Sequence, residues 1–252
     1  MINRKRTSVA IVTITAFFLM LSCLYAQSPF PPPPGPPSGP ALPPGAPFIE
    51  PQAKAAPIIQ LSPGVFRLGD IEINKKNKNI SFPAAVNMDK GLLEYALVRT
   101  GGKTHESLLR TNIEPYNLQI AFLLLGFEPT DRPLRGQGDP DKPRGEPIEI
   151  SISYDKVGKL VTIKPEEWMV QKNKDKDTDI KKLEWVYTGS VIWNGRFMTQ
   201  MEGSIIAVYH DPVALIDNAS EGGESDKIWF VKGGAAPPPG TPVKVTIKGK
   251  NK

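Results

Sequence analysis

The stretch Ile148-Glu149-Ile150-Ser151-Ile152-Ser153-Tyr154 decides the expected fold. Apolar and polar residues alternate throughout it, and this period of two is typical of a β-strand that buries one face. After the turn Asp155-Lys156-Val157-Gly158 comes Leu160-Val161-Thr162-Ile163, a second strand candidate that pairs naturally with the first. The two segments therefore predict an antiparallel hairpin.

Short apolar segments on both sides of this hairpin carry a similar signal. An earlier hairpin is expected where residues 71–73 and 80–82 flank the polar turn 74–79. Residues 92–98 are apolar but ambiguous between strand and helix. The remaining strand candidates are residues 65–68, 185–187, 191–193, 204–209, 228–231 and 243–247.

One segment is helical by its pattern. Pro115 is suited to the first turn of a helix, residues 116–125 continue without glycine or proline, and Gly126 ends the run. Residues 120–125 are apolar on every side, so this helix is expected to be buried against the sheet. The predicted fold class is α+β, with a mainly antiparallel sheet packed around one buried helix.

The N-terminus has the features of an export signal. A basic start, with Arg4, Lys5 and Arg6, precedes a mostly apolar segment 9–25, and Ala26 is a small residue at which signal peptidase could cut. The prediction is a signal peptide at 1–26. Two alternatives stay open: a lipoprotein cut that places a lipid on Cys23, and an uncleaved membrane anchor.

A proline-rich tether follows at residues 27–57. Residues 29–57 hold 13 of the 27 prolines, and such runs favour the extended, solvated polyproline II helix. It is expected to be a disordered spacer, or alternatively a ligand for a proline-binding groove. Residues 58–252 are of a normal length for a single globular domain.

Charge and cysteine content exclude several functions. The full chain carries a net charge of +5, but residues 1–26 supply three of those charges, so the mature chain is near +2. That excess is too small for a nucleic-acid surface, and no nucleic-acid partner is expected. Cys23 is the only cysteine, so a chain cut after Ala26 has no disulfide, thiolate-bound zinc or iron–sulfur cluster. No cofactor is expected.

A compact polar segment is the best candidate for ligand binding. It follows the glycine turn 101–102 and combines a cation, hydroxyls, an imidazole and a carboxylate. Its residues are Lys103, Thr104, His105, Glu106 and Ser107. The alternative role is structural, with Thr104 or Ser107 capping a turn and the other side chains satisfying backbone groups.

No metal site is expected, but one alternative is open. The chain has two histidines, and each is followed by a carboxylate. His210 also comes directly after the apolar strand candidate 204–209, so the two histidines could meet in the fold. A site built from His105, Glu106, His210 and Asp211 would suit a divalent metal. Whether the two histidines converge decides this alternative.

Several separated blocks of the chain resemble the YdjY domain family. They are residues 86–91, 101–109, 124–127 and 202–212, and the resemblance covers most of residues 58–250. It implies an exported bacterial domain, often lipoprotein-like, without an established activity. Some relatives are described as iron–sulfur proteins, but the mature chain lacks the cysteines for such a cluster.

The functional expectation follows from these features. The domain is expected outside the cytoplasm, in the periplasm, at the cell surface or secreted, as a non-enzymatic binding or structural module of the cell envelope. Its partner would be an envelope ligand or protein, and it would meet the membrane only through the signal segment or a lipid on Cys23. The alternative is an extracytoplasmic metal-assisted hydrolase, although no complete catalytic motif is present.

Overall fold

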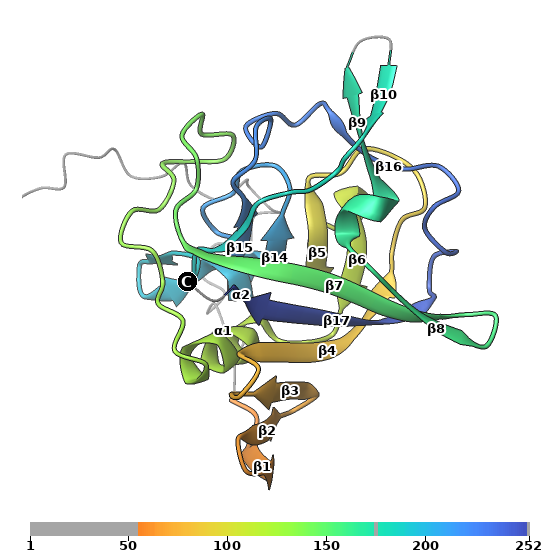
Figure 1. The fold of residues 1–252 in the computed structure, drawn as a ribbon. Helices are drawn as coiled ribbons and strands as arrows, with labels where there is room; N and C mark the ends of the chain where they lie inside the picture. Colours follow the sequence, from red (N-terminus) through yellow and green to blue (C-terminus); the bar gives the residue numbers. More distant parts are fainter. Residues whose placement is uncertain (1–54, 174–175, 251–252) are drawn as a thin grey trace, which may run out of the picture. The chain divides into compact units, whose positions relative to one another are not determined.

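Strands dominate the part of the chain that the structure describes. The computed structural model describes residues 55–173 and 176–250 (Figure 1). The predicted signal peptide lies outside the described residues, and so does the predicted tether except for residues 55–57.

The strands and helices have the following bounds. The strands of the main sheet are β1 (Ile58–Ser62), β2 (Val65–Leu68), β3 (Ile71–Asn74), β4 (Asn79–Val86), β5 (Tyr95–Arg99), β6 (Ser107–Thr111), β7 (Glu146–Lys156), β8 (Lys159–Ile163), β11 (Trp185–Tyr187), β14 (Ser204–Ala207), β15 (Ile216–Asn218) and β17 (Pro242–Gly249). The smaller sheets contain β9 (Met169–Asn173), β10 (Lys176–Asp179), β16 (Trp229–Val231), β12 (Ile192–Trp193) and β13 (Arg196–Phe197). The helices are α1 (Pro115–Leu124) and α2 (Met198–Glu202), with 3₁₀ turns η1 (Thr104–Glu106) and η2 (Pro165–Trp168).

Eight of these strands close into a barrel. They follow the hydrogen-bonded order β4-β17-β7-β11-β15-β14-β5-β6, and β6 returns to pair with β4. The closing contact pairs Ala85 with Arg110 and Val86 with Leu109. Two neighbouring pairs, β5–β6 and β14–β15, are parallel, and the other neighbours are antiparallel.

The alternation of residues along β7 and β17 fills the barrel. On both strands every second residue is buried, whereas most of the residues between them are more exposed. The buried residues are Ile148, Ile150, Ile152, Tyr154, Val243, Val245 and Ile247. Because the two strands are paired in register, these side chains form one continuous apolar layer.

The predicted α+β class with a sheet around one buried helix is wrong. Strands make up 42% of the structure and helices 11%, with only two helices in the described residues. The sheet curves back on itself and encloses its own side chains, so no helix is needed to fill the interior. The helix itself is present where the sequence predicts it, but it is buried on one side only. Phe122 stacks on Tyr187 at 4.5 Å, whereas Leu123 is 49% exposed.

Both predicted hairpins are confirmed by the pairing of β7 with β8 and of β3 with β4. Strand β8 pairs only with β7, so this hairpin projects away from the barrel (Figure 1). Strands β1, β2 and β3 extend the sheet from β4. Neither helix within residues 55–173 and 176–250 is long and apolar enough to cross a membrane.

Candidate functional site

A glycine turn brings Lys103 toward the end of α2. Gly101 has a φ of 92°, which glycine adopts without strain. A Cβ on Gly102 would lie 2.9 Å from the backbone oxygen of Glu202, so only glycine permits this close approach. The turn that follows β5 therefore packs directly against residues 202–203 and places Lys103 next to Glu202.

The Lys103 ammonium group is surrounded by partners from its own domain. It donates to the Tyr95 hydroxyl at 2.7 Å, and its Nζ lies 3.3 Å from Glu202 Oε2 and 3.7 Å from Asp211 Oδ2. The Lys103 side chain is 22% exposed. We call Tyr95, Lys103, Gln137, Glu202 and Asp211 the Lys103 cluster.

Tyr95 is the centre of this cluster. Its hydroxyl donates to Asp211 Oδ2 at 2.7 Å and accepts hydrogen bonds from Lys103 and from Gln137 Nε2, the latter at 2.9 Å. The residue is fully buried, and burial followed by the nearby Asp211 charge raises the pKa of Tyr95 well above its usual range. The phenol therefore keeps its proton and acts as a donor to the carboxylate.

Carboxyl groups beside the cluster have altered acidity. Burial, and then the neighbouring Glu106, raises the pKa of Glu94 to about 7, although the Lys103 charge opposes this. Burial also raises the pKa of Glu202, again against the effect of Lys103. Glu94 can thus exchange a proton near neutral pH, which an ordinary surface glutamate cannot.

The five residues predicted as a binding segment do not share one surface. Lys103 turns into the cluster, whereas His105 is 77% exposed and lies 3.4 Å from Glu106 through Nε2 and Oε2. Ser107 is fully buried and its hydroxyl donates to the Leu109 carbonyl at 2.7 Å. The backbone oxygens of Thr104 and Ser107 accept hydrogen bonds from the Asn87 side chain. Part of the segment therefore supports the local turn.

The second histidine is buried among backbone groups. His210 Nδ1 lies 2.7 Å from the Asp139 carbonyl oxygen, and Nε2 lies 2.9 Å from the Asn218 carbonyl oxygen. His105 instead contacts Glu106. Within the described ranges, no three His, Cys, Asp or Glu residues are grouped as metal ligands. Asp211 lies in the Lys103 cluster rather than beside His105.

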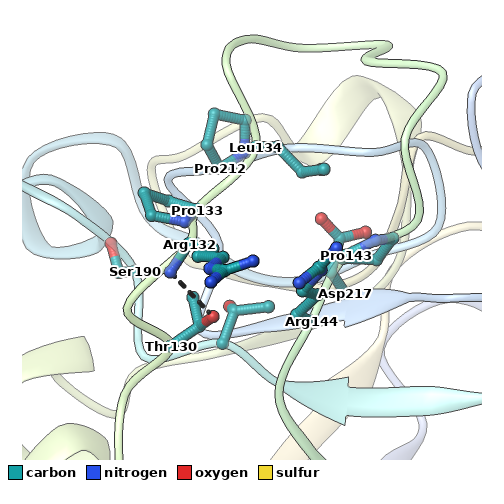
Figure 2. A pocket seen from close by; sticks show the side chains of 10 residues that line it. Thr130, Arg132, Pro133, Leu134, Pro143, Arg144, Ser190, Pro212 and Asp217 are labelled. Atoms are coloured by element: carbon teal, nitrogen blue, oxygen red, sulfur yellow. Dashed lines mark hydrogen bonds between the residues drawn. The ribbon is translucent and has the colours of Figure 1, made fainter. Parts of the chain in front are cut away.

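A small cavity lies next to the cluster. It has a volume of about 10 Å³ and is lined by Arg132, Arg144 and Asp217, among other residues (Figure 2). Asp217 is fully buried and accepts hydrogen bonds from the backbone N–H groups of Asp211 and Asn218. Burial raises the pKa of Asp217 well above its usual range. The cavity has room for about one water molecule, not for an organic ligand.

A larger, open hollow of about 860 Å³ adjoins this cavity and shares Thr130 and Arg144 with it as lining residues. Lys78, Asp131, Arg144, Glu146 and Lys250 are among its lining residues, and no member of the Lys103 cluster lines it. Lys78 and Glu146 form an ion pair at 3.0 Å across it. Cations and carboxylates are mixed here, so the hollow does not select one sign of charge.

Sequence reasoning missed three members of the cluster. Tyr95 reads as one more apolar strand residue, Glu202 ends a short helix, and Gln137 lies in a loop rich in proline and glycine. Gln137 reaches Tyr95 across 42 positions of the chain. A signal was available for Lys103, which follows the glycine turn 101–102, and for Asp211, which follows His210, but the two were assigned to different sites.

Comparison with known proteins assigns the chain to a family. The model of the YdjY domain matches residues 71–248, which is more than half of the sequence and includes the Lys103 cluster and all of the barrel except the last residue of β17. No curated protein and no solved structure matches the chain. The protein belongs to the YdjY domain family.

Proposed function

We propose that the chain is exported and that its domain serves in the cell envelope as a non-enzymatic binding or structural module. The observation that carries this proposal is the pairing of Lys103, whose ammonium group is held by Tyr95, Glu202 and Asp211. A lysine whose charge is neutralised by several groups of its own domain stabilises the fold. It would have to give up those contacts to bind a substrate.

Export is supported by the N-terminal sequence. A basic start, an apolar segment and a small residue at Ala26 are the three parts of a secretory signal. The proline-rich residues 29–57 follow directly and would separate the barrel from the membrane or wall. An exported chain cut after Ala26 has no cysteine, so packing of the barrel interior must stabilise it without disulfides.

Thermal unfolding of the full chain tests the structural role of the cluster. Lys103→Met removes the charge and leaves Glu202 and Asp211 without their cation, which should cost about 2 kcal/mol. The unfolding midpoint should fall by about 4–8 °C. His105→Ala is the matched control, because His105 lies two residues away and is mostly exposed. Its midpoint should stay within about 1 °C of the wild type. A Lys103→Met protein at least as stable as the wild type would contradict the proposal, since functional sites often sacrifice stability.

The mass and location of the expressed protein test export. We expect the protein outside the cytoplasm with the mass of residues 27–252. A mass that shows a lipid on Cys23 would assign it to the lipoproteins instead. Recovery of only the uncut chain from the cytoplasm would overturn the export proposal.

A second candidate function is an extracytoplasmic enzyme that uses acid–base chemistry. It is favoured by Glu94, whose pKa of about 7 suits a group that donates and accepts protons near neutral pH. The test compares wild type with Glu94→Gln on p-nitrophenyl esters, phosphates and glycosides. Turnover that disappears in the variant would favour the enzyme. Equal background rates would favour the binding or structural module.

A further inference from the structure

Two hairpins of the domain share one turn geometry but differ in sequence. Strands β7 and β8 are joined by Val157-Gly158, and strands β12 and β13 are joined by Asn194-Gly195. The φ angles are 54° and 78° in the first turn and 50° and 75° in the second. Positive φ at both central residues is the mark of the type I′ turn, for which Asn-Gly is the favoured sequence.

Val157 is therefore in a strained conformation. A β-branched residue at positive φ is an outlier, because its side chain crowds the backbone, whereas asparagine tolerates this region. Packing does not compensate for the strain, since Val157 is 97% exposed and the nearby Leu160 is 79% exposed. Two apolar side chains thus stand in solvent at the end of a hairpin that projects from the barrel (Figure 1).

The same turn also holds two like charges opposite each other. Lys156 and Lys159 are directly paired in the register of β7 and β8, and both are exposed. Like charges in this position destabilise a hairpin. Neither lysine forms an ion pair with another described residue. The nearest acid, Asp155, accepts a hydrogen bond from the Gly158 N–H at 2.7 Å. The strand pairing sets Asp155 opposite Leu160 rather than opposite a lysine.

We propose that the hairpin tip formed by residues 156–160 docks onto an anionic lipid surface. Anionic headgroups would relieve the repulsion between Lys156 and Lys159, and the apolar boundary below the headgroups would bury Val157 and Leu160. Long lysine side chains at such a boundary keep their charges among the headgroups. A bilayer suits this tip because it supplies both anionic headgroups for the two lysines and an apolar layer for Val157 and Leu160.

This inference deepens the proposed function, since an exported domain that is cut after Ala26 would still contact the membrane through this tip. If the chain instead carries a lipid on Cys23, docking would be effectively intramolecular, so that a weak contact could orient the domain. In both cases the barrel would lie against the lipid at the β7–β8 turn.

A fluorophore placed at the turn tests the inference on the full chain. Cys23→Ser leaves Gly158→Cys as the only cysteine, which then carries an environment-sensitive label. Gly195→Cys is the matched control, because both glycines have positive φ, both end a two-residue turn, and neither would place a Cβ within 4 Å of another atom. Vesicles contain either phosphatidylglycerol mixed with phosphatidylcholine or phosphatidylcholine alone.

We expect a blue shift of the label at 158 on the anionic vesicles and none at 195. Lys156→Glu combined with Lys159→Glu should abolish the shift at 158. A shift of equal size at both positions would overturn the inference, because it would reflect general adsorption through the N-terminal segment. A shift at 158 that is equally large on phosphatidylcholine alone would overturn the requirement for anionic lipid. The absence of a shift at 158 would overturn the lipid assignment and leave a protein groove as the alternative occupant. None of these outcomes depends on export or on the stability of Lys103→Met.

Discussion

The Lys103 cluster and the β7–β8 turn differ in whether their side chains find partners within the domain. In the cluster, polar groups that would be costly to bury are paired with each other, as Tyr95, Lys103 and Asp211 show. At the turn, apolar Val157 is exposed and like-charged lysines face each other. The polar groups of the cluster are paired within the domain, whereas Val157 is almost fully exposed and the two lysines form no ion pair with another described residue. The contrast indicates where a partner should be sought.

The largest expected effect comes from changing a buried glycine beside the cluster. A Cβ on Gly223 would lie 2.2 Å from His210 Nε2 and 2.7 Å from the Asn218 carbonyl oxygen, so Gly223→Ala must displace the buried ring. We expect a loss of about 3 kcal/mol in the free energy of unfolding, measured with denaturant. Gly158→Ala meets no atom within 4 Å and should cost only about 1 kcal/mol, from its positive φ. Equal losses in the two variants would show that the interior near His210 yields as easily as the turn.

A smaller effect is expected from the titration of Glu94. Its pKa is about 7 in the folded protein against 4.5 in the unfolded chain, so the folded state binds the proton more tightly. The stability that this carboxyl group contributes is present below pH 4.5 and is lost as the pH rises through 7. The loss should be about 1 kcal/mol, once solvent screening of this half-buried group is included. Melting curves between pH 5 and 8 measure it. Glu94→Gln should flatten that slope, whereas exposed Glu149→Gln should preserve it.

The smallest effect sharpens the comparison of the two turns. Val157→Asn gives the β7–β8 turn the favoured sequence of the other hairpin and should stabilise the protein by about 0.5–1 kcal/mol. Asn194→Val makes the reverse change and should destabilise it by a similar amount. Both are measured by thermal unfolding in the absence of lipid. If Val157→Asn is less stable than the wild type, the turn is not strained and the argument for an external partner loses its first step.

Much of the local structure could be predicted from the sequence. Alternation identified β7 and its partner β8, and the proline and glycine that bound residues 115–126 identified α1. Closure could not be predicted, because alternating residues look the same in an open sheet and in a barrel. The barrel closes through two residue pairs between β4 and β6, for which there is no local signal.

The candidate site was harder to predict from the sequence than the local structure, for a similar reason. Lys103 and Asp211 were both singled out, but for different sites, and their meeting depends on Tyr95. In the sequence that tyrosine looks like any other residue of an apolar strand, so nothing indicates that it contacts both Lys103 and Asp211. His210 was a candidate ligand because of its residue type and its place between the apolar segment 205–209 and Asp211. Its burial between two carbonyl groups depends on a loop that reaches it from residue 139. Contacts between distant segments thus decide both the fold class and the site.

The position of β17 determines when the domain can fold. This strand lies between β4 and β7 and pairs with both, so on this side of the barrel these two strands are joined only through residues 242–249. Contacts of such long sequence separation form slowly. A chain that is still crossing a membrane, N-terminus first, lacks this strand on the far side, and its barrel stays open until nearly all of it has passed. If the chain is exported as proposed, the order of the strands would delay closure of the barrel until the end of transport.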